Sequence, residues 1–202
     1  MAQNLERLTI KRKTGAEQFH VDGQELDFNL LSFWQWMASD LVNNALRGEL
    51  AEYIVARALG LDTLKPREPW AAFDLQTPSG IRIEVKSAAY VQSWYQSRLS
   101  TIIFNVPKTL YWDSITNRQA KEKQRQADVY VFALLAHQDK ETIDPLNINQ
   151  WAFYVLPTAV LNERTRSQYS ITIKSLVKLC GKALTYDELR QAVEAAVGKK
   201  IE

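Results

Sequence analysis

The sequence predicts an α/β fold in which one β-sheet is covered by helices on both faces. Helical patterns in the first third lead into a short hairpin, and two near-continuous apolar runs follow at residues 128–136 and 151–156. Such runs are typical of strands buried on both faces, and separated buried strands combined with helices indicate a layered domain. With 202 residues, 46% of them hydrophobic and 24% charged, the chain can build a sizeable core. We expect a single domain over residues 1–202, with a core at about 29–160 and with residues 1–28 and 161–202 packed on it as extensions.

The first third predicts a hairpin and two helices. Asp22-Gly23 is a hairpin signal within a polar stretch. The apolar letters LLSFWQWM predict a short helix capped by Asn29 or Asp27. A second helix is expected over residues 40–59, ended by Gly60. Its expected apolar stripe is Leu46, Leu50, Tyr53 and Ile54, which leaves Glu52 on a flank with small alanines.

The centre of the chain is the stretch FDLQTPSGIRIEVKSA, residues 73–88. Its second half alternates apolar and charged residues with a period of two, which predicts a half-buried strand with Glu84 and Lys86 on one face. A first short strand is expected at residues 73–76. Pro78, Ser79 and Gly80 suit a three-residue loop, since Pro favours the first corner and Gly the left-handed position.

That loop sets the register of the hairpin. Thr77 is expected to face Ile81, Gln76 to face Arg82, and Asp74 to face Glu84. The apolar residues then share one buried face: Phe73, Leu75, Ile83 and Val85.

After the hairpin, strands and helices alternate with polar connections. Strands are expected at residues 100–106, 128–136, 151–156 and 170–174. A short helix is expected at residues 157–161 and a longer one at 185–197, the latter with a capping box of Thr185 and Glu188.

Asp74 and Glu84 are the main candidates for chemistry. Directly opposed residues lie about 4.5–5.5 Å apart at Cβ, and two carboxylates at that distance repel each other unless a cation lies between them. Oxygen ligands on a rigid hairpin suit Mg²⁺, which takes one or two carboxylates and keeps several waters. Lys86 can orient or deprotonate one of those waters. The alternative is a solvated Glu–Lys strand face with no chemistry.

Asp74 followed by Glu84-Val85-Lys86 resembles the signature of the PD-(D/E)xK nuclease superfamily, which has the restriction-endonuclease-like fold. The resemblance implies that Asp74 and Glu84 hold the metal, that the Val85 carbonyl joins them, and that Lys86 assists the attacking water. Phe73 stands where the name of the motif has Pro, a position that varies in the family.

A second element of the family is G-x-x-A/G-E on the helix before the hairpin. Gly48, Ala51 and Glu52 match it, which implies that Glu52 is a third metal ligand or supports the other two. The alternative for Glu52 is an ordinary surface acid on a helix.

The resemblance implies a Mg²⁺-dependent endonuclease acting on DNA, with Mn²⁺ able to substitute for Mg²⁺. Two alternatives stay open: an inactive module with this fold that binds nucleic acid or supports an assembly, and an RNA-directed nuclease with the same residues. By analogy with superfamily members that cut both strands as dimers, a homodimer is expected.

The formal net charge of +2 does not by itself indicate nucleic-acid binding, so a basic surface must be local. The best candidate is the basic segment over residues 107–127, which also holds Tyr111 and Trp112. The expected contacts to the nucleic-acid backbone are Lys108, Lys121, Lys123 and Arg125, with Gln92 reaching a phosphate or a water. The alternative is a solvated loop and helix, with Gln92 an exposed strand residue.

Composition also sets expectations about location. The single cysteine, Cys180, excludes an intrachain disulfide and fits a reducing compartment. No run of about 18 apolar residues occurs, so no membrane span and no membrane partner are expected, and we expect a cytoplasmic protein.

Overall fold

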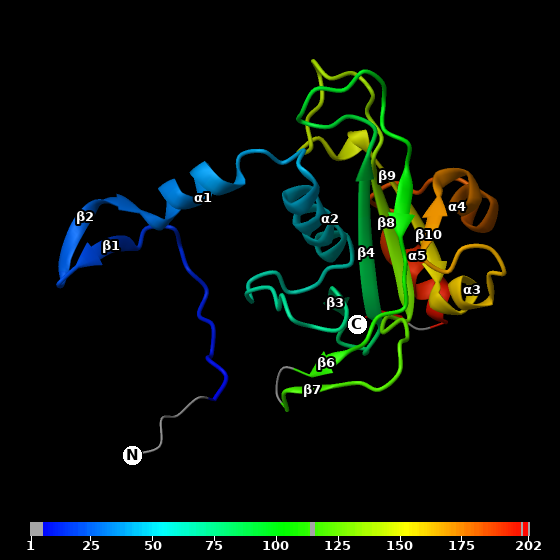
Figure 1. The fold of residues 1–202 in the computed structure, drawn as a ribbon, viewed down its shortest axis with the longest axis horizontal. Coiled ribbons are helices and arrows are strands. Elements are labelled where there is room, and N and C mark those ends of the chain that lie inside the picture. Colours follow the sequence, from blue (N-terminus) through cyan, green and yellow to red (C-terminus); the bar gives the residue numbers. More distant parts are fainter. Residues whose placement is uncertain (1–5, 114–115, 199, 202) are drawn as a thin grey trace.

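The computed structural model describes residues 6–113, 116–198 and 200–201. They form a layered body and an arm that projects from it (Figure 1). The body is built on a four-stranded sheet with the strand order β3-β4-β8-β9. The strands of this sheet are β3 (Leu75–Gln76), β4 (Arg82–Ala89), β8 (Val129–Leu135) and β9 (Trp151–Pro157).

The sheet is mixed. β4 and β8 run parallel, and the pairs β3–β4 and β8–β9 are antiparallel. All seven residues of β8 are buried, as its apolar run predicts, because β8 lies between two other strands and between two helical layers. Three two-stranded sheets accompany it in the described part of the chain: β1 (Gln18–Val21) with β2 (Gln24–Asn29), β5 (Ile103–Asn105) with β10 (Ser170–Thr172), and β6 (Trp112–Asp113) with β7 (Arg118–Gln119).

Helices cover both faces of the central sheet, as expected. The helices of the described residues are α1 (Leu30–Ala38), α2 (Asn44–Ala58), α3 (Thr158–Glu163), α4 (Ile173–Cys180) and α5 (Leu189–Val197), with a short 3-10 turn at Ile148–Gln150. α2 and α5 pack on one face, and α3 and α4 pack on the other (Figure 1). No helix in the ranges described above is both long and apolar enough to cross a bilayer.

Two apolar cores follow from this layering. The first lies under α2 and α5 and contains Ile83 and Val85 of β4. The second lies under α3 and α4 and contains Tyr130 and Phe132 of β8. Because side chains alternate along a strand, Glu84 and Lys86 point to the face of the second core, opposite the helix that carries Glu52.

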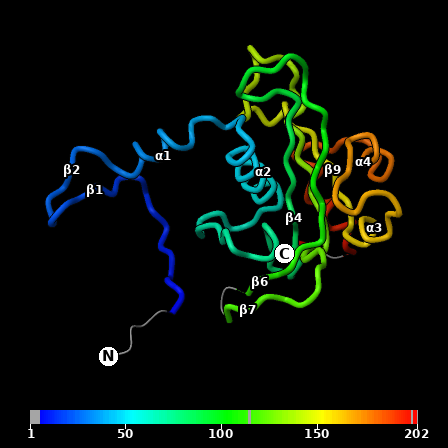
Figure 2. The backbone as a smooth tube through the Cα atoms, in the orientation of Figure 1, coloured from blue at the N-terminus to red at the C-terminus, as the bar shows by residue number. Residues whose placement is uncertain are grey.

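Residues 16–28, part of the N-terminal segment that is expected to pack on the core, are largely exposed. β1, β2 and α1 form an arm, residues 15–38, that stands away from the sheet (Figure 2). Asp22-Gly23 makes the predicted turn, with both residues at positive φ. Asn29 caps α1 by accepting the N–H of Ser32 at 3.0 Å. The chain then enters the body through α2 (Figure 2).

Several predicted details are wrong. Tyr53 is 54% exposed rather than part of the buried stripe of α2, whose buried residues are Arg47, Ala51, Ile54, Val55 and Ala56. α2 begins at Asn44 rather than at residue 40, because the side chain of Asn43 caps it by accepting the N–H groups of Ala45 and Leu46. No pattern in the sequence indicated the β6–β7 hairpin or α4.

Candidate active site

The part of the central hairpin that forms a ladder has the predicted register, and the predicted pairing of Asp74 with Glu84 lies outside that ladder. Gln76 pairs with Arg82 and Leu75 with Ile83. Gly80 adopts φ +85°, the left-handed conformation expected for the loop. The Thr77 hydroxyl accepts the N–H of Ile81 at 2.9 Å and closes the turn. The loop therefore holds the start of β4 at a fixed place beside β3.

The first strand of the hairpin is shorter than expected. β3 covers only Leu75 and Gln76, and the chain leaves the ladder at Asp74. Phe73 consequently packs against the second core instead of sharing a face with Ile83 and Val85. The alternation fails there because residues outside a strand lose its period of two.

Asp74 lies just outside β3 but still forms hydrogen bonds with the edge of β4. Its Oδ2 accepts the backbone N–H of Val85 at 2.7 Å, while its own N–H donates to the carbonyl of Ile83 at 3.1 Å. Asp74 is thus tied to β4 through both backbone and side chain. Val85 contributes its N–H to this arrangement; its carbonyl, the predicted ligand atom, stays a prediction.

The carboxyl group of Asp74 has an unusual protonation equilibrium. Burial is the largest cause, followed by the negative charges of Glu84 and Glu52, and together they raise the pKa of Asp74 to about 7. The Val85 N–H and the charge of Lys86 oppose this shift. Only the part of the shift that comes from Glu84 and Glu52 reflects a negative field, and that field favours a positive charge at this position.

Glu84 and Lys86 form an ion pair on the same face of β4. The Lys86 Nζ lies 2.5 Å from Oε1 of Glu84, and the side chains of Lys86 and Glu84 are 31% and 19% exposed. Strand alternation explains the contact, because residues i and i+2 share one face. Asp74, Glu84 and Lys86 are therefore brought together at one edge of the sheet.

Glu52 is held by an arginine that no sequence pattern singled out. Arg67 donates from Nε to Oε2 of Glu52 at 2.5 Å and from Nη2 to Oε1 at 2.8 Å. Such two-pronged pairs are the strong form of a carboxylate–guanidinium contact. Glu52 acts on Asp74 through its charge, while its own oxygens are occupied by Arg67. Its predicted role as a third ligand stays a prediction.

These residues fit a divalent cation in part. In the described ranges, no group of three or more His, Cys, Asp or Glu is arranged to hold a metal ion. The pair of Asp74 and Glu84 nevertheless offers hard oxygen donors, and the negative charge of Glu84 acts on the carboxyl group of Asp74. Mg²⁺ needs only one or two protein carboxylates. The donor set thus suits a two-carboxylate site.

A tyrosine beside Glu84 was also missed. Tyr130 of β8 pairs in register with Glu84 of β4 and is buried. Burial, followed by the charge of Glu84, raises its pKa, so its hydroxyl keeps its proton. The signal that could have found it was a tyrosine inside the apolar run DVYVFALLA, because a buried phenol needs a hydrogen-bond partner.

Two of the predicted nucleic-acid contacts lie inside the protein. Gln92 is 6% exposed, and its amide donates to the carbonyl of Ala89 and to the Ser100 hydroxyl. Arg125 is 7% exposed. Its guanidinium donates to the carbonyls of Val106 and Gln168 and to the side chains of Asn162 and Gln168.

The sequence pattern could not separate Arg125 from its neighbours. Lys121, Lys123 and Arg125 are spaced two residues apart, and of the three only Arg125 is buried. Lys108, Lys121 and Lys123 are exposed, so they are free to make the predicted contacts.

Comparison with known proteins gives one finding. A family model described as bacteriophage T4 endonuclease IV matches residues 3–173, a span that includes Glu52, the hairpin and β8. A search among curated proteins found no match.

Proposed function

The chain belongs to the bacteriophage T4 endonuclease IV family, and on that premise we propose that it is a metal-dependent DNA endonuclease whose active site is Asp74, Glu84 and Lys86. The observation that supports this most is the pair of carboxylates at the edge of β4. One of them has its pKa raised to about 7 by burial and by the other's charge, and an ammonium group lies on the same face.

Under this proposal Asp74 and Glu84 would hold a Mg²⁺ ion, and Mn²⁺ could replace it. A divalent ion bound there would polarise a phosphoryl oxygen and lower the pKa of a bound water. The chain's own residues do the positioning. The hairpin and the Val85 N–H fix Asp74, and Lys86 orients the attacking water and offsets the charge that develops on the phosphate.

Glu52 supports this site from the helix on the other face of the sheet. Its charge contributes to the raised pKa of Asp74, so it strengthens the attraction for a cation even while Arg67 holds its oxygens. The exposed residues Lys108, Lys121 and Lys123 are proposed to contact the DNA backbone. The assignment to the restriction-endonuclease-like fold belongs to the same proposal: a helix with Glu52, a hairpin with the motif, and a mixed sheet support it.

The test is cleavage of single-stranded and plasmid DNA with Mg²⁺ or Mn²⁺ by the wild type and by Asp74→Asn, Glu84→Gln and Lys86→Met. Each variant should lose at least about 100-fold in rate, the scale of one electrostatic contact to a transition state. The control variant is Asp187→Asn, which removes an exposed carboxylate outside the proposed site. It should cut like the wild type.

If the three variants cut as fast as the wild type, the proposed active site is wrong. Cleavage of RNA but not of DNA would favour the RNA-directed alternative. Binding of DNA by the wild type without cleavage under any metal would favour an inactive binding module.

A further inference from the structure

The arm, residues 15–38, leaves its apolar surface uncovered. On α1 the outer stripe is Phe33, Trp36 and Met37, which are 40%, 83% and 46% exposed. Their spacing of three and four residues puts them on one face of the helix. The inner side of α1 lies over Gly15, where a Cβ atom would come within 3.1 Å of Trp34. The exposed stripe therefore faces away from the arm's own contacts.

The hairpin of the arm has a second uncovered face. The rings of Phe19 and Phe28 lie 4.8 Å apart between centroids and are tilted by 35°, which shows that their strands share an apolar side. Val21 and Leu26 are also exposed, at 56% and 38%. An isolated two-stranded hairpin is marginally stable in water, and so is an isolated short helix such as α1. A partner that covers these faces would stabilise the arm.

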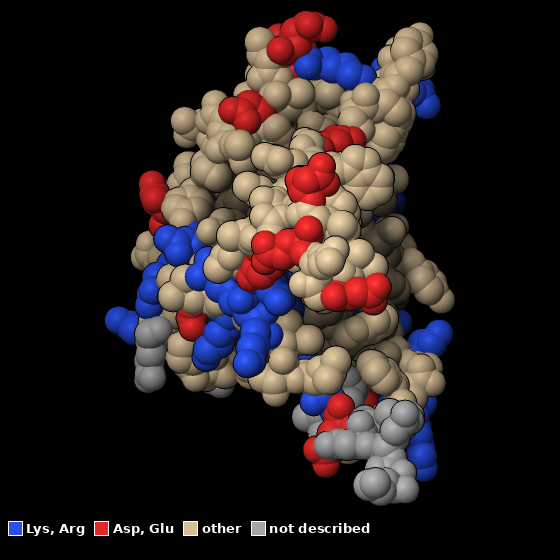
Figure 3. Space-filling view, turned by 90° about the vertical axis from the view of Figure 1, so that its left-hand side faces the viewer, with Lys and Arg blue, Asp and Glu red and all other residues tan. Residues whose placement is uncertain are grey.

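The charge of the arm shows which partners fit. Residues 15–38 contain no Lys or Arg and four acids, namely Glu17, Asp22, Glu25 and Asp27. A surface with this negative charge repels nucleic-acid phosphates and anionic lipids, both of which select Lys and Arg. Figure 3 shows the molecule from the side of the arm: acidic side chains lie in a largely uncharged surface, next to a cluster of Lys and Arg.

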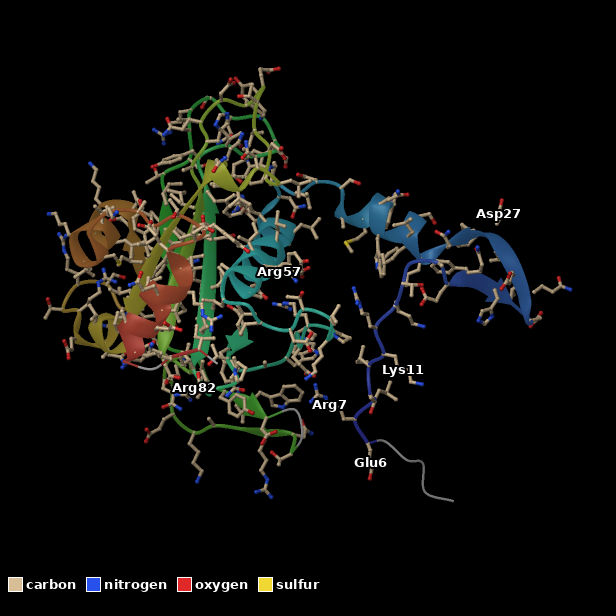
Figure 4. The ribbon with its side chains drawn as sticks, turned by 180° about the vertical axis from the view of Figure 1, so that it is seen from behind. Glu6, Arg7, Lys11, Asp27, Arg57 and Arg82 are labelled. Carbon is tan, nitrogen blue, oxygen red and sulfur yellow. The ribbon has the colours of Figure 1, made fainter. Side chains whose placement is uncertain are left out.

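A cationic segment precedes the arm. Lys11, Arg12 and Lys13 belong to the stretch that precedes the arm in the sequence. Earlier in the same stretch, Arg7 forms an ion pair with Glu68 of the body. Figure 4 shows Asp27 on the arm, and Lys11 and Arg7 along this stretch. A surface that carries an apolar face, an acidic hairpin and a basic segment is complementary to a second copy of itself in a two-fold arrangement.

The exposed area agrees with a two-fold dimer. The exposed apolar side chains of the arm offer on the order of 800 Å² per chain, which is about what each partner contributes to a standard stable interface. We propose that the arm is a dimerisation element: in a two-fold dimer, α1 and the β1–β2 hairpin pack against the same elements of a second copy, and the acidic hairpin of one chain meets Lys11, Arg12 and Lys13 of the other.

The test is sedimentation equilibrium of the full chain from about 1 to 100 μM. The wild type should dimerise, and Phe33→Glu combined with Trp36→Glu should raise the dimer Kd by roughly 100-fold or more, since central aromatic residues dominate interfaces. Val21→Glu on the hairpin should weaken the dimer in the same direction. The matched control is Trp94→Glu combined with Tyr95→Glu, another exposed aromatic pair, 51% and 88% exposed, on the body; it should dimerise like the wild type.

Far-UV circular dichroism should show the same folded body in every variant, because all the substituted side chains are exposed. A wild type that stays monomeric at 100 μM overturns the proposal, and so does a dimer that survives all the arm substitutions. If a monomeric wild type instead binds DNA or lipid vesicles and loses that binding in the arm variants, the occupant is not a second copy.

Discussion

The raised pKa of Asp74 predicts an unusual dependence of stability on pH. The group titrates near 3.8 when unfolded and at about 7 when folded. A raised folded pKa means that this group's contribution is fully present below pH 4, is lost as the pH rises toward 7, and then stays constant. The shift is about 3 pKa units, and each unit corresponds to about 1.4 kcal/mol. After allowance for solvent screening of a partly exposed carboxyl group, about 2 kcal/mol should be lost between pH 5 and pH 8.

The assay is urea denaturation of the wild type and Asp74→Asn at pH 5 and pH 8, in the presence of a chelator. The asparagine side chain is neutral at both pH values and can still accept the Val85 N–H through its amide oxygen. The difference in unfolding free energy between the two proteins should therefore shift by about 2 kcal/mol in favour of the variant as the pH rises. Titrating groups that do not interact with Asp74 cancel in that difference, and Asp187→Asn should follow the wild type.

Equal pH slopes for the wild type and Asp74→Asn would refute the electrostatic account of the site. The carboxylates would then not repel each other, and the physical reason for a cation there would disappear.

Further predictions concern the cations around the site. Arg67→Gln leaves the partly buried Glu52 without its partner and should lower the unfolding free energy by about 1–2 kcal/mol, whereas Lys65→Gln, in the exposed pair with Asp62, should leave the urea midpoint unchanged. Arg125→Gln should destabilise by about 3 kcal/mol, because it removes buried hydrogen bonds and leaves the carbonyl of Val106 without a donor; an unchanged midpoint would contradict the burial. Substituting Lys108, Lys121 and Lys123 by Gln should weaken DNA binding and lower the slope of log K against log salt by up to about 3; a slope equal to that of the wild type would show that these lysines do not contact the backbone.

The hairpin could be predicted in register from its letters because two local rules agree there. A Pro-Ser-Gly loop allows few lengths, and a period of two fixes which residues face the core. The buried strands β8 and β9 could be predicted equally well from the sequence, since an apolar run of that length bounded by polar residues is typical of a strand inside a sheet.

The rest depends on contacts between residues distant in sequence. Arg67 and Glu52 meet because the connector after α2 folds back, which no local pattern shows. Arg125 differs from Lys121 and Lys123 only in what surrounds it, namely Asn162 and Gln168 from the region after β9. The sequence did not predict the arm, because an apolar helix is normally expected to be buried. In the described residues, no other part of the chain covers the outer stripe of α1.

The central claim is that Asp74 and Glu84 share one divalent cation. Titration of Mn²⁺ into the protein, followed by electron paramagnetic resonance, tests it most directly. The account predicts one bound Mn²⁺ per chain in the wild type, and at least about tenfold weaker binding in Asp74→Asn and in Glu84→Gln. Undiminished binding in both variants, or no bound Mn²⁺ in the wild type, would contradict it.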